Sequence, residues 1–247
     1  MNSVTVDQTL ADVVTTDPGS ARVLESFGLD YCCGGRRRLD DACSALGLDP
    51  AAVLAELAKL EPESEPGWAT MTPLELVDHI ESTHHGYLHT EFDRLDALAA
   101  KVAGVHGGSH PELMDIQAAY GELRADLEPH LMKEERVLFP MIRELAAAAR
   151  RPTFHCGSVS NPISMMTIEH DRAGELLATL RALTNGYEPP ADGCASYRAL
   201  FEGLAELEAD THLHVHKENN LLFPAVVSLE QQLERPSRRM GEGDPGL

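Results

Sequence analysis

The chain has 247 residues, of which 40 are acidic and 20 are basic, giving a formal net charge of −20. Such a surface repels nucleic acid and anionic membranes, so we expect neither as a direct partner. The sequence shows no run of about 18 apolar residues and no basic-then-apolar amino terminus, so we expect neither a membrane span nor an export signal. Its five cysteines do not suggest a disulfide framework, so the expected compartment is the reducing cytoplasm.

Residues 1–62 are expected to form a small helical unit. Asp17-Pro18 supplies an N-cap and a first-turn proline for a helix that Phe27-Gly28 ends. Two further short helices are expected, one ending near Gly47 and one running from Asp49-Pro50 to about Lys59.

Residues 71–232 are expected to form an up-down-up-down four-helix bundle. An acidic, proline-broken stretch at 61–67 precedes it and indicates a boundary, so we place a linker at 63–70. The chain is rich in helix formers and lacks alternating β-branched residues, so the predicted class is all-α. The four long helices are expected at 72–101, 109–150, 161–183 and 193–232. Residues 233–247 lack apolar periodicity and are expected to be disordered.

Local signals refine two of these helices. Thr72-Pro73-Leu74-Glu75 and Ser109-His110-Pro111-Glu112 both match the capping box that begins a helix. Pro129 falls inside the second helix, directly before His130, where it is expected to bend or break the helix.

A pattern in the bundle occurs twice: His130-x3-Glu134 and His214-x3-Glu218, each followed by Leu-Phe-Pro. A single histidine precedes each copy at nearly the same distance, because 45 residues separate His85 from His130 and 44 separate His170 from His214. Residues four apart share one helix face, so each pair can direct an imidazole and a carboxylate to one spot. One such pair alone is typical of a solvated helix face, but the repeat with matching flanks favours a binuclear metal site. The ligand types suit iron, zinc or manganese.

Cys32-Cys33, followed by Gly34-Gly35, is a second candidate for a chemical role. Adjacent cysteines are poorly placed for an unstrained disulfide, and their thiolates could bind iron or act as nucleophiles. The arginines at 36–38 would lower the thiol pKa if they lie close. The alternative is a pair of small, semi-buried residues at a helix end. Cys43, Cys156 and Cys194 are expected to be ordinary buried residues.

The chain resembles the iron–sulfur cluster repair di-iron proteins over about residues 7–232. Four segments resemble their hemerythrin-like domain: HHGYLHTEFDRLDAL, PHLMKEERVLFPMI, SNPISMMTIEHDRAGELL and HVHKENNLLFP. The stretch TLADVV to VLESFGLDYCCGG resembles the small domain that precedes it in that family. The resemblance implies a cytoplasmic protein that can form a homodimer and that restores iron–sulfur clusters damaged by nitric oxide or oxidants.

The resemblance also implies two non-haem irons with an oxo, hydroxo or solvent bridge. The ligands carried over are His85, His130, Glu134, His170, His214 and Glu218. Two imidazoles would bind each iron, and the two carboxylates would bridge irons about 3.5–4 Å apart. A small diatomic, nitric oxide or oxygen, would approach at the solvent or bridge position.

The remaining polar residues are expected to be secondary. Glu169, next to His170, is a candidate partner of a ligand or a surface residue. His84 is expected at the surface or behind a ligand, and His106 has a possible role behind a ligand. The others are expected to be structural or solvated: His79, His89, His212 and His216.

The leading interpretation is a metal-binding repair protein that delivers iron to damaged iron–sulfur proteins, with Cys32 and Cys33 receiving or handing over metal. One alternative is a hemerythrin-like carrier or sensor of oxygen or nitric oxide, against which the Cys-Cys unit argues. Another is a di-iron redox enzyme, which would need an external electron donor because the sequence shows no electron-transfer module.

Overall fold

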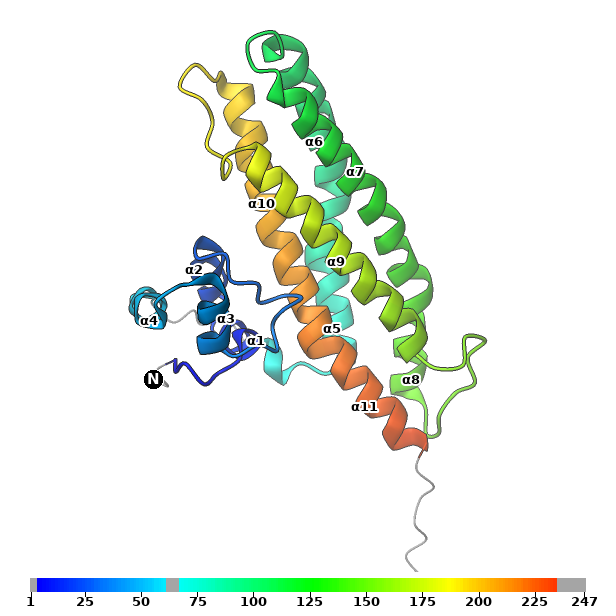
Figure 1. The fold of residues 1–247 in the computed structure, drawn as a ribbon. Helices are drawn as coiled ribbons and strands as arrows, with labels where there is room; N and C mark the ends of the chain where they lie inside the picture. Colours follow the sequence, from blue (N-terminus) through cyan, green and yellow to red (C-terminus); the bar gives the residue numbers. More distant parts are fainter. Residues whose placement is uncertain (1–3, 61–66, 235–247) are drawn as a thin grey trace, which may run out of the picture.

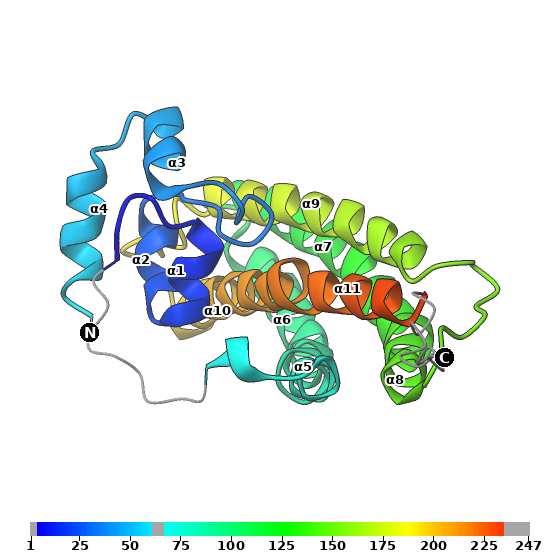
Figure 2. The same cartoon turned by 90° about the horizontal axis from the view of Figure 1, so that it is seen from below.

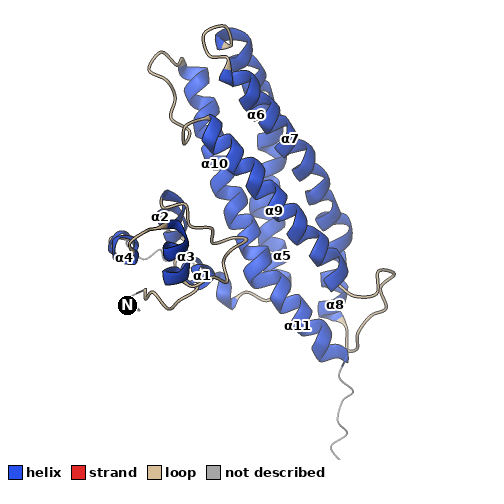
Figure 3. Ribbon diagram, viewed as in Figure 1, coloured by secondary structure: helices blue, strands red, loops and turns tan. Residues whose placement is uncertain are grey.

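The computed structural model describes residues 4–60 and 67–234, and within these ranges all regular secondary structure is helical (Figure 3). The prediction of an all-α chain with a four-helix bundle is therefore confirmed. Within the described ranges, no helix is both long and apolar enough to cross a membrane.

The amino-terminal part contains four short helices. They are α1 (Leu10–Thr16), α2 (Ser20–Ser26), α3 (Leu39–Leu46) and α4 (Pro50–Leu57). Two of the sequence signals behave as expected: Asp49 caps α4 by accepting from the Ala51 N–H, and Gly47 ends α3 in the left-handed conformation. Helix α1 was not predicted, although Thr9 caps it by accepting from the Asp12 N–H.

The predicted start of a helix at Asp17-Pro18 is wrong. Asp17 ends α1 and its carboxylate accepts from the Gly19 N–H, 3.1 Å away, within a tight turn. Helix α2 then begins at Ser20, without a side-chain cap. The Asp-Pro pair therefore joins two helices, and the expected end of the second helix at Phe27-Gly28 is where α2 stops.

Four long helical segments form the bundle (Figure 1). The first contains α5 (Pro73–Ile80), η2 (Glu81–His85) and α6 (Gly86–His106); the second contains α7 (Glu112–Lys133), η3 (Glu134–Leu138) and α8 (Phe139–Ala147); the third is α9 (Ser160–Leu183); the fourth contains α10 (Ala195–Lys217), η4 (Glu218–Leu222) and α11 (Phe223–Glu234). Helices α6, α7, α9 and α10 contact one another in a closed ring. A short 3-10 turn, η1 (Trp68–Thr70), precedes the bundle.

Three of the four segments contain a π-helical turn, which the sequence analysis did not predict. In η3 and η4 the N–H of Phe139 donates to the Glu134 carbonyl and that of Phe223 donates to the Glu218 carbonyl. A proline follows each phenylalanine, and a proline ring collides with the carbonyl four residues earlier in a regular helix. The wider turn relieves this collision, so the repeated Leu-Phe-Pro accounts for two of the π-turns. The third, η2, precedes Gly86 and has no proline after it.

The predicted cap at Ser109 is wrong, and so is one of the two outcomes expected at Pro129, a break in the helix. Ser109 does not cap the second segment, because Pro111 is the N-cap residue of α7 and no side chain accepts a hydrogen bond there. Ser109 lies instead in the turn that ends α6, where its N–H donates to the His106 carbonyl, 2.9 Å away. Helix α7 begins at Glu112, and it continues without a break through Pro129. Only one backbone hydrogen bond is lost at Pro129, and the neighbouring Leu127 and Leu131 are buried in the core, so packing holds the helix together.

Two apolar cores divide the molecule. One fills the end of the bundle that contains α5, α8 and α11, and it is continuous with the buried residues of α1 to α4. The other lies between α6, α7, α9 and α10. Figures 1 and 2 show α1 to α3 beside the fourth segment of the bundle. The small helices therefore share their core with one end of the bundle.

The proposed division of the chain stays a prediction. Residues 63–66 of the expected linker lie outside the described residues, while 67–70 include the η1 turn. Of the tail expected at 233–247, residues 235–247 also lie outside the described ranges, and Leu233 and Glu234 end α11.

The capping box at Thr72 provides a test of the fold that does not touch the candidate site. Thr72 accepts from the Glu75 N–H, and its own N–H donates to the Glu75 carboxylate at 2.7 Å. We expect Thr72→Ala to lower the free energy of unfolding by about 1 kcal/mol. Thr90→Ala, at an exposed position within α6, should instead raise it by a few tenths, up to about 0.7 kcal/mol. Urea denaturation of both variants measures this, and equal effects would contradict the assignment of the cap.

Candidate metal centre

Six ionisable side chains converge in the middle of the bundle, where the two apolar cores meet. Each segment contributes at least one: His85 from η2, His130 and Glu134 from α7 and η3, His170 from α9, and His214 and Glu218 from α10 and η4. None of the six is more than 2% exposed. The structure thus brings together all six residues that the sequence analysis put forward as ligands.

The six residues form two groups of four that share both carboxylates. One group is His85, His214, Glu134 and Glu218; the other is His130, His170, Glu134 and Glu218. In each group the potential ligand atoms lie within 4.8 Å of one another. Two histidines on either side of a pair of shared carboxylates is the arrangement expected when carboxylates bridge two cations.

The unsatisfied polar atoms test whether a metal fits here. Both carboxylate oxygens of Glu134 and of Glu218 are buried without a hydrogen bond. Imidazole Nε2 atoms approach them, for example His130 at 3.3 Å from Glu134 Oε2 and His170 at 3.1 Å from Glu218 Oε2. Buried charges of this kind are costly unless they are paired or coordinate a cation, so the donor set fits a metal.

The distances between the imidazole nitrogens also indicate that the site fits a cation. The Nε2 atoms of His85 and His214 are 3.3 Å apart, and those of His130 and His170 are 3.2 Å apart. When both rings present lone pairs, contacts this short require a proton or a cation between or beside them. Each pair therefore lies where a cation could bind.

Three of the four imidazoles are oriented through their other nitrogen. The Nδ1 of His85 lies 2.9 Å from Glu135 Oε1, and the Nδ1 of His130 lies 2.9 Å from Glu169 Oε2. His170 Nδ1 lies 3.0 Å from Asn219 Oδ1. These acceptors place the proton on Nδ1 and leave Nε2 free to bind a metal, which is the usual arrangement around metal-bound histidines. The structure thus favours a partner role for Glu169 over that of a plain surface residue.

The fourth imidazole has a different environment. His214 Nδ1 is buried without a hydrogen bond, and its ring stacks on that of His84, with the ring centroids 5.5 Å apart. His84 is itself buried, so the possibility of a surface position is excluded. It lies between Asp210 Oδ1 and Lys217 Nζ, each at 2.8 Å, and burial beside Lys217 lowers the pKa of His84 far below its usual range.

Without a bound cation, the buried charges of the site favour protonated imidazole. Burial disfavours the charged form of His130, but the neighbouring Glu134 outweighs it and raises the pKa of His130 to about 9. Burial acts against the charge on Glu218, but His214 and His170 hold the pKa of that carboxyl well below its usual range. A proton on His130 therefore balances part of the carboxylate charge, and a cation would replace it.

The other histidines lie outside the cluster. His106 is at the far end of α6, about 30 Å along the helix from His85, and its Nε2 lies 3.1 Å from Cys194 Sγ, so it has no role behind a ligand. His89 lies 2.8 Å from Glu135, the same carboxylate that orients His85. Three further histidines contact other parts of the protein: His79 contacts Lys217, His212 contacts Glu25, and His216 contacts Thr15 and Asn220.

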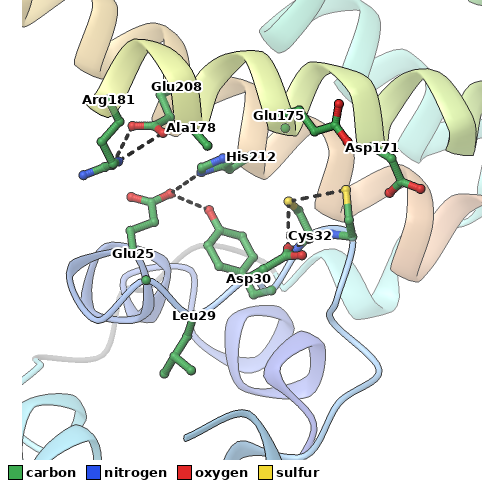
Figure 4. A pocket seen from close by; sticks show the side chains of 14 residues that line it. Glu25, Leu29, Asp30, Cys32, Asp171, Glu175, Ala178, Arg181, Glu208 and His212 are labelled. Carbon is green, nitrogen blue, oxygen red and sulfur yellow. Dashed lines mark hydrogen bonds and ion pairs between the residues drawn. The ribbon is translucent and has the colours of Figure 1, made fainter. Parts of the chain in front are cut away.

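The Cys32-Cys33 loop lies between α9, α10 and the amino-terminal helices. Asp30 shapes it, because its Oδ1 accepts from the N–H groups of Cys32 and Cys33 at 3.0 and 2.9 Å, and its Oδ2 accepts from that of Gly34 at 2.8 Å. This turn brings the two Sγ atoms to 3.9 Å from each other (Figure 4). The thiols are free, and Cys32 is buried while Cys33 is partly exposed.

A cavity of about 440 Å³ opens beside the two thiols. Its wall contains Asp171 and Glu175 of α9, whose carboxylates lie on the same side as the sulfurs in Figure 4. The expectation that neighbouring arginines lower the thiol pKa is wrong for Cys32. The Cys33 thiol, burial and Asp30 together raise the pKa of Cys32 well above its usual range, while Arg38 pairs with Asp7 and Asp40.

The remaining cysteines differ from one another. Cys43 is buried, as expected, but Cys156 is only partly buried and Cys194 is exposed. Cys194 is the N-cap residue of α10, where backbone N–H groups and His106 lower the pKa of its thiol to about 7. The prediction that all three are ordinary buried residues is therefore wrong for Cys156 and Cys194.

Binding of a divalent cation to the cluster should depend on pH. Neutral imidazole is the ligand, and His130 holds a proton up to a pKa of about 9, so each displaced proton weakens binding as the pH falls. We expect Zn²⁺ affinity to rise between about pH 6 and 9, by up to about tenfold per pH unit for each proton displaced. Chelator competition at several pH values, with proton release measured in weak buffer, tests this. An affinity that does not change with pH would contradict it.

Two family profiles match the chain. The hemerythrin HHE cation binding domain matches residues 76–226, and the ScdA_N domain, described as a domain of unknown function (DUF542), matches residues 6–61. The first covers the four-segment bundle, including the six converging side chains. The second covers α1 to α4 and the Cys32-Cys33 loop.

Curated relatives match over nearly the whole length. The chain is 33% identical over 225 residues to a probable iron-sulfur cluster repair protein of Haemophilus influenzae, covering 90% of this chain and 97% of that protein. It is 35% identical over 225 residues to the iron-sulfur cluster repair protein YtfE of Enterobacter sp. (91% and 98% covered) and 36% identical over 223 residues to that of Musicola paradisiaca (90% and 96% covered). The chain belongs to this family of iron–sulfur cluster repair proteins, in which an ScdA_N domain is joined to a hemerythrin HHE cation-binding domain.

Proposed function

We propose that the protein binds two irons at the central cluster and repairs iron–sulfur clusters damaged by nitrosative or oxidative stress by delivering iron. The observation that carries this proposal is the pair of His2Glu2 groups that share both carboxylates. The printed names of the relatives supply the process, iron–sulfur cluster repair. Damaged iron–sulfur proteins would then be the partners, and nitric oxide or oxygen the small ligand.

In this proposal the Nε2 atoms of His85 and His214 would hold one iron and those of His130 and His170 would hold the other. Glu134 and Glu218 would supply carboxylate oxygens to both groups. Imidazole and carboxylate donors suit iron, and the bound pair would supply a redox-active centre with a position open to a diatomic. The protein's contribution is to fix ring orientation through Nδ1, exclude bulk water and balance the charge of the carboxylates.

The two thiols are proposed to receive or hand over iron. Two thiolates on one tetrahedral ion with metal–sulfur bonds of about 2.3 Å lie about 3.8 Å apart. The observed separation of the two Sγ atoms is 3.9 Å. A cation would also reverse the unfavourable charge environment of Cys32, because a coordinating thiol is deprotonated. The geometry and the acidic cavity wall together support a transient metal position.

The cellular setting follows from the same proposal. All five cysteines are free, which supports action in the reducing cytoplasm. A homodimer, which the family resemblance suggested, remains a proposal that sedimentation of the iron-loaded protein would test.

The bridging carboxylates provide a test of the centre. We expect Glu218→Ala to reduce iron from about two per chain to one or none, because both cations lose a shared ligand. The bundle should still fold, since the carboxylate oxygens of Glu218 make no hydrogen bonds. Glu202→Ala, at an exposed position of α10, is the matched control. The measurement is the iron content of anaerobically purified protein. Full iron content in Glu218→Ala would refute the proposal that Glu218 bridges the two irons.

A second test separates delivery from retention. The double variant Cys32→Ser with Cys33→Ser should keep the iron content and visible spectrum but fail to restore a damaged iron–sulfur enzyme. Cys194→Ser, which removes the exposed thiol at the far end of the bundle, should restore it as well as the unmodified protein does. Iron that falls as the client regains activity supports delivery. Iron that stays bound and responds only to oxygen or nitric oxide supports the sensor or carrier instead, and normal repair by the double variant would exclude a transfer role for the thiols.

A further inference from the structure

The two halves of the metal centre are related by the repeated sequence, and the residue after each bridging carboxylate has the same task. Glu135 follows Glu134 and accepts from His85 Nδ1 at 2.9 Å. Asn219 follows Glu218 and accepts from His170 Nδ1 at 3.0 Å. In both halves, therefore, the residue next to a bridging glutamate orients the histidine that the preceding helix contributes.

The chemistry of this residue differs between the halves. Glu135 is a carboxylate, which can only accept, and its second contact is with His89 at the surface, 2.8 Å away. Asn219 is an amide, which can also donate, and its Nδ2 donates to the Cys32 carbonyl at 3.4 Å. A carboxylate at this position could not make that second bond.

The two hydrogen-bond partners of Asn219 require the same orientation of its amide group. His170 needs an acceptor, because its Nε2 faces the carboxylates and its proton is on Nδ1. The Cys32 carbonyl needs a donor, and it also receives the Nδ2 of Asn220 at 3.0 Å. One amide orientation satisfies both ends.

The loop is thus held on two sides. Asp30 binds the backbone N–H groups of Cys32 and Cys33, and the amides of Asn219 and Asn220 bind the Cys32 carbonyl. Only the contact through Asn219 continues directly to a candidate metal ligand, His170. Asn219 thus joins His170 directly to the backbone that carries both thiols.

We propose that Asn219 is a positioning residue that couples the cation position held by His130 and His170 to the Cys32-Cys33 loop. Metal at that position and the accessibility of the thiols then depend on each other. Coupling of this kind is reciprocal: if metal changes the thiol loop, disturbing the loop changes metal affinity by the same factor. The inference rests on the metal centre proposed above, but it does not depend on client repair.

The test measures thiol accessibility and uses Zn²⁺ alone as the probe, because it does not oxidise thiols. The rate of alkylation of Cys33 is measured by mass spectrometry in the metal-free protein and with Zn²⁺ saturating the centre. We expect Zn²⁺ to change this rate about fivefold or more in the unmodified protein. In Asn219→Asp, which is nearly isosteric but cannot donate to the Cys32 carbonyl, the ratio of the two rates should fall to about one.

Glu135→Gln is the matched control in the other half. It weakens the partner of His85 and should lower Zn²⁺ affinity by about tenfold or more, but at saturation it should keep the alkylation ratio. A ratio retained in Asn219→Asp would overturn the proposal, because it would mean that Zn²⁺ protects the thiols directly. A ratio lost in both variants, or absent from the unmodified protein, would overturn it as well. If Asn219→Asp fails to fold, Asn219→Ser removes the same donor and must give the same loss.

The reverse direction is tested at Gly35. A Cβ there would lie 2.4 Å from the Tyr31 carbonyl oxygen and 2.9 Å from Asn220 Oδ1, so Gly35→Ala must displace the loop without touching a metal ligand. We expect this variant to bind Zn²⁺ about fivefold or more weakly, measured as the equilibrium partition of Zn²⁺ between the protein and a chelator. An unchanged partition, with an alkylation rate showing that the loop has moved, would refute reciprocal coupling. Client repair plays no part in either measurement, so failure here and failure of the repair proposal are distinguishable.

Discussion

The structure depends on six ionisable side chains buried where two apolar cores meet. Four carboxylate oxygens in this layer make no hydrogen bonds, and two pairs of imidazole nitrogens face each other at little more than 3 Å. Burying such groups is unfavourable unless a cation or protons neutralise them. The surrounding helices must therefore hold these groups together against the repulsion between the two carboxylates. The extensive apolar packing on either side of the layer provides that support.

Local periodicity and a repeated spacing made three features predictable from the sequence. These are the presence of the helices, their assembly into a bundle and the convergence of the six polar residues. His130 and Glu134 lie four apart and face one way, so their approach follows from helix geometry alone. The cap at Thr72 is likewise a short-range feature. The sequence interpretation was wrong where packing overrides a local rule: α7 passes through Pro129, and Asp17-Pro18 ends one helix instead of beginning another.

The features that were not predicted depend on contacts between distant segments or on subtle local geometry. Two of the π-turns, η3 and η4, follow from prolines placed after Glu134 and Glu218, yet the sequence analysis treated those prolines as ordinary helix positions. The hydrogen-bond partners of the histidines are harder to predict from the sequence. Glu135 belongs to a different helix from His85, and Asn219 contacts both His170 and the Cys32 backbone only in the folded chain. No periodicity encodes a contact of that kind.

The repeated sequence does not give the two halves the same histidine partners. A symmetric centre would orient His85 and His170 through equivalent carboxylates. Replacing the carboxylate by the amide of Asn219 weakens the electrostatic support for His170 but adds a donor for the Cys32 carbonyl. His170 therefore has a neutral partner, and that partner reaches the backbone of Cys32. The asymmetry does not make this group the more loosely held one, because His130 keeps the carboxylate of Glu169 as its partner while His214 in the other group has no partner on Nδ1. What the amide adds is the contact between the metal centre and the thiol loop.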